Sequence, residues 1–259
     1  MKYAWSPEIK GGFESWSLAP WRRLGLEVYH HLQEIPEDRI LLVSHFAPWW
    51  EPLRSWIAAG RPWIEIEYGY WGPDTKWRET RRVTYRGHHN LTMKPPPWTR
   101  AQEFPEPAQR PWRDSGGDFV LIVMPVAEIL TQRTGEHIAE WQARMEHEVR
   151  KYWAGPIAWR EKTGSRRTRF AHFAQQIQNA YAVVGERTMA ATEACLLGVP
   201  GFTVDTTMSS LLMGSIENLA APPRPDRTAW WEHVCWSQFH VREFQTDAPA
   251  RLTELYQIG

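Results

Sequence analysis

Residues 180–205 read AYAVVGERTMAATEACLLGVPGFTVD, and this stretch decides the fold class. It begins with a short apolar run, which is typical of a buried strand. Thr188 is a good N-cap residue, and the alanine-rich segment after it predicts a helix. Gly198 and Pro200 are expected to end that helix, because glycine readily adopts the left-handed conformation and proline cannot continue a helix. A second apolar run at 201–205 completes a strand–helix–strand unit.

The same alternation occurs twice more before this stretch. Apolar runs at 118–125 and 156–160 predict two further strands. Apolar residues at helical spacing predict a helix around 138–152, between these runs, and another around 170–181. Strands that alternate with helices predict a doubly wound, Rossmann-like parallel sheet.

The first half of the chain repeats this order more loosely. Strands are predicted at 39–45 and 62–69, and helices around 21–32 and 52–59. The stretch 86–117 is rich in proline and ends in Ser-Gly-Gly, which predicts an irregular connection.

These patterns predict an α/β protein with two Rossmann-like halves. The first half spans 1–115 and the second 116–225. A C-terminal helical segment at 226–259 is expected to follow, with a helical stretch at 227–244 and a short closing helix around 249–256.

Composition limits the possible partners. The 30 basic and 30 acidic residues cancel, so the chain lacks the overall positive charge that drives non-specific binding of nucleic acid. Two cysteines are too few for a disulfide framework, which suits a reducing cytoplasm. No apolar run approaches the roughly 18 residues that span a membrane, so we expect a cytoplasmic protein without a membrane partner. Most of the 17 tryptophans are expected to pack in cores, although some could stack on a base or a sugar.

Several catalytic motifs are missing from the sequence. It contains no His-Glu-x-x-His or Cys-x-x-Cys spacing, so we predict no metal site. It also lacks the Gly-x4-Gly-Lys phosphate loop, the Gly-x-Gly-x-x-Gly fingerprint and the Gly-x-Ser-x-Gly elbow. Kinase, dehydrogenase and hydrolase functions therefore lose their main sequence support.

The loop after the run at 156–160 is a candidate phosphate-binding loop. In a parallel sheet, ligands bind outside the carboxyl ends of the strands, where the helices begin. Backbone N–H groups at a helix start and nearby cations both favour an anion. The predicted donor-binding residues of this loop are Arg160, Lys162, Thr163, Ser165 and Arg166. A solvated basic turn is the alternative interpretation.

A second set of predicted donor-binding residues begins at Gly185, where the predicted strand ends. Thr188 would start the next helix, and Glu193 would lie one to two turns into it. There its carboxylate could accept hydrogen bonds from a pair of sugar hydroxyls, although an isolated helical glutamate is more often simply exposed. Ser209 belongs to a hydroxyl-rich stretch expected to line the same crevice.

The pattern Thr188-x4-Glu193-x4-Gly198-x-Pro200 resembles the donor half of GT-B-fold glycosyltransferases. The resemblance covers about residues 118–215. It implies that Glu193 binds the ribose of a nucleotide-sugar and that Arg160 and Lys162 meet its pyrophosphate. In that family the strand usually ends in a small hydroxyl residue, whereas this sequence reads Gly-Glu-Arg at 185–187.

A wider resemblance spans most of the chain. Glycosyltransferase-like proteins of tailed bacteriophages are similar in the order of five further motifs: GYW (69–71), RRVTYRGHHN (81–90), PWR (111–113), WREK (159–162) and AWWEHVCWSQFHVREF (229–244). Several phages with related enzymes decorate hydroxymethylated pyrimidines in their DNA. This resemblance implies a phage protein that acts in the host cytoplasm.

The first half should then hold the acceptor and a general base. Transfer to a hydroxyl needs a group that takes its proton, and His45 and Glu67 lie at strand ends where such a group is expected. Tyr68 and Tyr70 could orient the acceptor. Three residues of a basic, aromatic loop could contact DNA phosphates, although a solvated loop is the commoner outcome: Arg82, Arg86 and His88.

The sequence therefore predicts a glycosyltransferase. It would move a sugar from a nucleotide-sugar co-substrate, expected to be a UDP-sugar, and would hold no tightly bound cofactor. The favoured acceptor is a 5-hydroxymethyl pyrimidine in double-stranded phage DNA, which would be extruded from the duplex; a glycan or small molecule remains an alternative. Two other functions stay open. One is transfer of an amine or amino acid to an activated pyrimidine, and the other is nucleotide binding without turnover.

Overall fold

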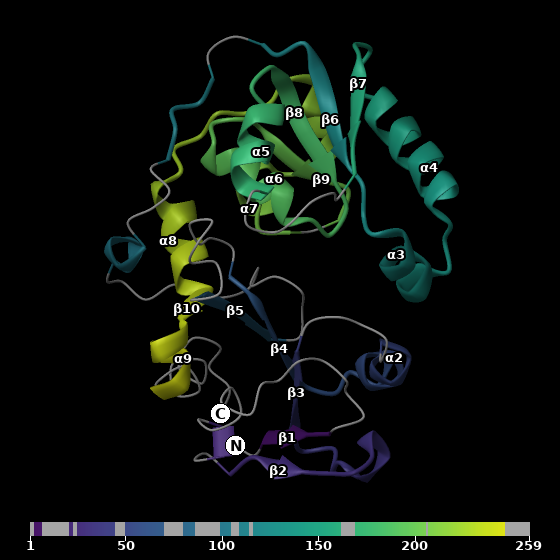
Figure 1. Ribbon diagram of the computed structural model, residues 1–259, viewed down its shortest axis with the longest axis vertical. Helices are drawn as coiled ribbons and strands as arrows, with labels where there is room; N and C mark the ends of the chain where they lie inside the picture. Colours follow the sequence, from purple (N-terminus) through teal and green to yellow (C-terminus); the bar gives the residue numbers. More distant parts are fainter. Residues whose placement is uncertain are drawn as a thin grey trace. The chain divides into compact units, whose positions relative to one another are not determined.

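The computed structural model describes residues 3–6, 21–22, 25–44, 50–69, 80–85, 99–104, 109–113, 116–161, 169–205 and 207–246. The chain packs as two compact units, and each contains one β-sheet (Figure 1). Unit 1 comprises Met1–Gly69, Trp77–Arg100 and Glu232–Gly259, and unit 2 comprises Tyr70–Lys76 and Ala101–Trp231. The C-terminal segment thus returns to the first unit. The sequence-based division instead separates 1–115, 116–225 and 226–259.

Unit 2 contains a four-stranded sheet, and all of its strand pairs are parallel. Its strands are, in spatial order, β7 (Ile157–Arg160), β6 (Phe119–Val123), β8 (Ala180–Gly185) and β9 (Gly201–Thr203). All four lie within the runs predicted from the sequence. These runs are nearly continuous in apolar residues, as expected for strands buried on both faces.

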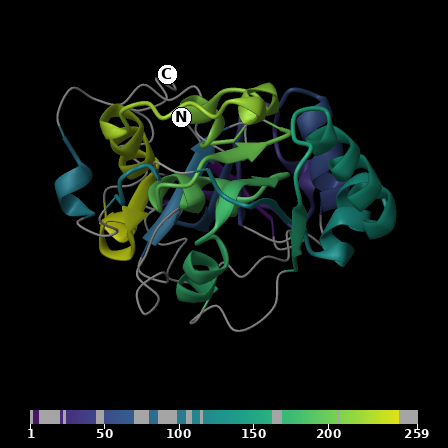
Figure 2. The same ribbon diagram turned by 90° about the horizontal axis from the view of Figure 1, so that it is seen from above.

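Helices connect these strands in the predicted alternation. In chain order the connecting helices are α3 (Ala127–Thr134), α4 (Ile138–Arg150), α5 (Arg169–Gln176) and α6 (Met189–Leu196). Helix α7 (Ser210–Met213) follows β9, and short 3-10 helices lie at Ala101–Glu103 and Ile216–Ala220. Helix α4 lies beside the edge strand β7 (Figures 1 and 2). It buries the stripe Trp141, Met145 and Val149, and the ring of Trp141 meets that of Trp159 edge to face.

Helix α6 packs closely against the sheet because its residues are small. Ala190 and Ala194 join a core with Leu121, Val183 and Phe173. All the residues of the helix except Met189 and Glu193 are buried. The helix thus lies inside unit 2 with one narrow, partly exposed stripe.

The predicted ends of α6 are confirmed. Thr188 is the N-cap, and its hydroxyl accepts a hydrogen bond from the Ala190 N–H at 3.2 Å. Gly198 follows the helix with a φ of 79°, in the left-handed region where glycine carries no steric penalty. A side chain at Gly198 would also meet the carbonyl oxygen of Pro111.

Unit 1 contains a mixed six-stranded sheet. Its spatial order is β10 (Gln238–His240), β5 (Thr80–Tyr85), β4 (Trp63–Tyr68), β3 (Ile40–Ser44), β1 (Tyr3–Trp5) and β2 (Glu27–Val28). The strands from β4 to β2 pair in parallel, whereas β5 is antiparallel to both β4 and β10. The predicted strands at 39–45 and 62–69 are confirmed as β3 and β4.

Alternate residues of β3 face two different cores. Leu41 and Val43 pack with Leu53 and Trp56 of helix α2 (Trp50–Ala58). Leu42 lies in a second core, which also contains Trp21, Trp236 and Phe239. This period of two is the signature of a sheet covered on both faces.

The helix predicted at 21–32 is wrong, and the helical prediction at 227–244 is confirmed only in part. The stretch predicted as a helix at 21–32 contains the strand Glu27–Val28, and Gly25 has a φ of 80° that no helix accommodates. A 3-10 helix follows at Leu32–Glu34. Around 227–244, helix α8 (Thr228–Trp236) stops and β10 adds to the sheet before helix α9 (Val241–Thr246). Pairing of β10 with β5 and burial of Phe239 override the helical spacing. The closing helix predicted at 249–256 lies outside the described residues.

In the described part of the chain, no helix combines the length and the apolar character needed to cross a membrane.

Candidate functional site

Strand order places a topological switch point between β6 and β8. The chain leaves β6 toward β7 on one side and later crosses to β8 on the other. Connections therefore diverge at the carboxyl ends of β6 and β8, where ligands bind in open α/β sheets. Residues 124–126 follow β6, residues 186–188 follow β8, and Asp205 follows β9. We call these residues the switch-point edge.

The turn from β8 into α6 is tightly built. A Cβ atom at Gly185 would clash with the methyl group of Thr188, so a larger residue there would displace that side chain. Arg187 has a φ of 45°, which is uncommon for a residue other than glycine, and its N–H donates to the Asp205 carboxylate at 2.9 Å. The N-terminus of α6 therefore opens at the switch-point edge, where its N–H groups favour an anion.

Gly185 and Thr188, both predicted to bind the donor, thus lie together at this edge. Glu193 lies further along α6, on the partly exposed stripe that it shares with Met189. Its side chain is partly exposed. Its contact with a ribose stays a prediction.

Arg160 ends β7 but is almost fully buried. Its Nε donates to Gln176 Oε1 at 2.7 Å, and its guanidinium lies 4.9 Å from the centre of the Phe173 ring. The guanidinium therefore ties β7 to α5, and its role toward phosphate stays a prediction. The other residues of the predicted phosphate loop lie outside the described residues: Lys162, Thr163, Ser165 and Arg166.

Ser209 is fully buried within a chain of hydroxyl groups. Its Oγ lies 3.0 Å from Thr207 Oγ1, which in turn lies 3.0 Å from Thr203 Oγ1. Thr203 Oγ1 also donates to the Asp205 carbonyl at 2.6 Å. These contacts brace the connection after β9, so they hold Asp205 at the switch-point edge.

Asp205 is a candidate site residue that the sequence analysis left out. Burial raises the pKa of its carboxyl group, although the hydrogen bond from the Arg187 N–H partly opposes this shift. Its second oxygen lies 3.8 Å from Arg187 Nε. Its position two residues after the buried strand β9 was the available signal.

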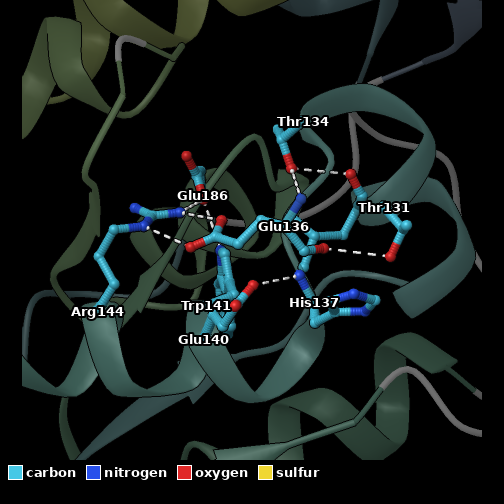
Figure 3. A network of polar contacts seen from close by, with 9 residues as sticks. Thr131, Thr134, Glu136, His137, Glu140, Trp141, Arg144 and Glu186 are labelled. Carbon is cyan, nitrogen blue, oxygen red and sulfur yellow. Dashed lines mark hydrogen bonds and ion pairs between the residues drawn. The ribbon is translucent and has the colours of Figure 1, made fainter.

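A second missed feature is an ion-pair network around Arg144 (Figure 3). Arg144 Nε and Nη2 donate to the two carboxylate oxygens of Glu136 at 2.9 Å each, and Nη2 also donates to Glu186 Oε2 at 2.8 Å. The same Glu186 oxygen accepts from Trp141 Nε1 at 2.5 Å. Hydrogen bonding to Arg144 lowers the pKa of Glu136, and its bond to Glu136 in turn raises the pKa of Arg144.

The connection between α3 and α4 holds Glu136 in place (Figure 3). Thr134 Oγ1 accepts from the Glu136 N–H at 3.1 Å, and Thr131 Oγ1 donates to the Glu136 carbonyl at 3.1 Å. One residue on, the N–H of His137 donates to Glu140 Oε2 at 2.9 Å, which closes the start of α4. The network therefore rests on the end of α3 and the start of α4, both of which are held by hydrogen bonds.

Of the unit 1 candidates, two have described side chains. Glu67 is half-buried on β4 and pairs in register with Arg82 on β5. Arg82 is 1% exposed in a strand, so its placement in a solvent-facing basic loop is wrong. The sequence TRRVTY was not predicted as a strand because an arginine occupies a position that faces the interior. The catalytic role of Glu67 stays a prediction.

The remaining candidates for the acceptor side cannot be placed. Tyr68 ends β4, but its side chain lies outside the description. Four residues lie outside the described residues altogether: His45, Tyr70, Arg86 and His88.

The described residues contain no group of three or more His, Cys, Asp or Glu side chains that could hold a metal ion. Both cysteines are buried and free. Burial raises the pKa of the Cys195 thiol to about 12, which keeps it protonated and unreactive.

Comparison with known proteins shows what the fold resembles. No family model and no curated protein matches the sequence. Among solved structures, the chain is similar to the beta Kdo 2,7 transferase KpsC of Thermosulfurimonas dismutans. The TM-score is 0.52 at 13% identity, and the match covers 100% of this chain and 99% of that one. The protein therefore has a mixed α/β fold with parallel strands that resembles the fold of a glycosyltransferase. The GT-B arrangement of its two halves stays a prediction.

Proposed function

We propose that the protein is a glycosyltransferase that binds a nucleotide-sugar at the switch-point edge and transfers its sugar to a hydroxyl group. The observation that carries this proposal is the similarity in fold to a sugar transferase over the full length of both chains. Support comes from the all-parallel sheet of unit 2, whose switch point is the usual ligand position in such sheets.

The donor diphosphate would lie at the N-terminus of α6. Its negative charge would meet the N–H groups that follow Thr188 and the positive end of the helix dipole. Stabilising the diphosphate as it leaves accelerates transfer of the sugar. The loop after β7 would contribute further phosphate contacts through Arg160, Lys162, Thr163, Ser165 and Arg166, and Glu193 would accept ribose hydroxyls.

Unit 1 would supply the acceptor side. His45 or Glu67 would take the proton of the attacking hydroxyl, since either side chain can act as a general base. Loss of that proton as the new bond forms keeps the glycosylated oxygen neutral.

We propose a saccharide hydroxyl as the first acceptor class to test, because the solved structure with the similar fold is that of a Kdo 2,7 transferase. A 5-hydroxymethyl pyrimidine in DNA is the second class, motivated by the resemblance to phage proteins. Burial of Arg82 removes one of the cations expected to contact DNA. The balanced charge of the chain also disfavours a nucleic-acid acceptor.

Thermal unfolding with a panel of nucleotide-sugars tests donor binding. At a ligand concentration of 100 times Kd, binding adds about 2.7 kcal/mol to the free energy of unfolding, so the melting temperature should rise by several degrees. Glu193→Gln should abolish the rise. Glu146→Gln, which changes an exposed glutamate on α4, should leave the rise intact. A wild-type protein that responds to no nucleotide-sugar would contradict the proposal.

A further inference from the structure

We infer that Glu186 determines specificity by accepting a hydroxyl group of the nucleotide-sugar, and that Arg144 and Trp141 position it. This inference rests on the proposed function and adds a residue to the donor site. Glu186 is the first residue after β8, so it lies at the switch-point edge itself, before the turn at Arg187 that leads into α6.

One oxygen of the Glu186 carboxylate is firmly anchored. Oε2 accepts hydrogen bonds from Trp141 Nε1 at 2.5 Å and from Arg144 Nη2 at 2.8 Å. Trp141 is completely buried, and Arg144 is held on its other side by both oxygens of Glu136. The carboxylate is therefore fixed before any ligand arrives, which lowers the entropy cost of binding.

The other oxygen is available. Among the described residues, Oε1 of Glu186 has no hydrogen-bond or ion-pair partner, and the side chain is 22% exposed. An ionised carboxylate only accepts hydrogen bonds. Its natural partner in a ligand is thus an O–H or N–H group.

Local charge favours a hydroxyl over a phosphate at this point. The two carboxylates of Glu136 and Glu186 share a single guanidinium, so the network carries a net negative charge. The neighbouring pair of Arg187 and Asp205 is balanced. A diphosphate oxygen beside Glu186 would be repelled, whereas a neutral hydroxyl gains a charge-assisted hydrogen bond.

Two parts of the donor carry suitable hydroxyls: the ribose and the transferred sugar. Isothermal titration separates them. The probes are ADP, CDP, GDP, UDP and dTDP, the 2′,3′-dideoxy form of whichever binds, and the nucleotide-sugars that stabilise the wild type. A ribose contact appears as tighter binding of the ribonucleotide than of its dideoxy form, and a sugar contact as tighter binding of the nucleotide-sugar than of the nucleotide.

Glu186→Ala should remove one of these preferences. We expect affinity for the hydroxyl-bearing ligand to fall about tenfold or more, as for a hydrogen bond to a charged group, while affinity for the ligand without the hydroxyl changes less than about twofold. Glu186→Gln keeps the side-chain volume and serves if the alanine variant does not fold. Arg144→Lys should reduce the same preference in part, because lysine keeps the positive charge but lacks the planar guanidinium that bonds Glu136 and Glu186 together.

Glu146→Gln is the matched control on α4 and should preserve both preferences. Equal losses for ligands with and without the hydroxyl, or no loss in Glu186→Ala, would overturn the inference while the proposed function stands. If no nucleotide or nucleotide-sugar binds the wild type, the proposed function fails, and the inference fails with it.

Discussion

Gly201 is the position where a single methyl group should reveal how α6 packs against the sheet. It opens β9, and a Cβ atom built there would lie within 2.9 Å of three backbone atoms of Ala191 in α6. Backbone atoms cannot rotate away as a flexible side chain can. Gly201→Ala must therefore push the helix away from the strand.

The expected cost follows from overpacking. Inserting a methyl group into a well-packed core costs about 1–3 kcal/mol. For a chain of this size each 1 kcal/mol lowers the melting temperature by about 2–4 °C. We expect Gly201→Ala to lower the melting temperature by about 2–12 °C.

Thermal unfolding followed by circular dichroism measures this effect. Gly116→Ala is the matched control, because a Cβ atom there meets only Tyr181 Cδ2 at an ordinary 3.9 Å. Its melting temperature should stay within about 2 °C of the wild type. If Gly201→Ala has the same melting temperature as the wild type, α6 does not approach β9 as closely as described. Close packing of the alanine-rich helix against the sheet would then be refuted.

Three further predictions concern buried polar groups. Arg100→Ala should lower the free energy of unfolding, measured with urea, by about 3–5 kcal/mol. The reason is that the fully buried guanidinium of Arg100 bonds both Glu243 oxygens, at 2.6 and 2.5 Å. A loss below about 1 kcal/mol would contradict this. The stability of Asp205→Asn relative to the wild type should increase as pH rises. Burial raises the folded-state pKa of Asp205 above the ordinary 3.8, so ionisation of this carboxyl group destabilises the folded wild type, whereas the asparagine does not ionise. Melting curves from pH 4 to 8 check this, and a pH-independent difference would refute it. Cys195 should resist a thiol reagent under native conditions and react after unfolding, and rapid native labelling of its peptide by mass spectrometry would contradict its burial.

The sequence predicted unit 2 better than unit 1 because its signals are local. Each strand of the parallel sheet is a short apolar run between helices, and the cap at Thr188 and the stop at Gly198 depend on neighbouring residues. In unit 1, β5 and β10 depend on each other across more than 150 positions. No local pattern in TRRVTY or SQFHVREF records that pairing.

The residues of the candidate site also differ in whether their sequence signal is local. Gly185 and Thr188 were found because they adjoin a recognisable strand end. Glu186 stands between them but reads alone as an ordinary loop glutamate. Its anchoring depends on Trp141 and Arg144, more than 40 residues earlier, whose polar groups meet it only after α4 has packed. Long-range polar contacts of this kind produce no periodic pattern in a sequence.

The most direct test of the proposed function is release of nucleotide from a nucleotide-sugar. The protein is incubated with each nucleotide-sugar that raises its melting temperature, with saccharide acceptors in one series and 5-hydroxymethyl-pyrimidine DNA in another, and products are separated by liquid chromatography and mass spectrometry. We expect acceptor-dependent nucleotide release with a matching glycosylated product, and loss of both in Glu193→Gln. Absence of product with every donor and acceptor, from protein that is folded, would contradict it.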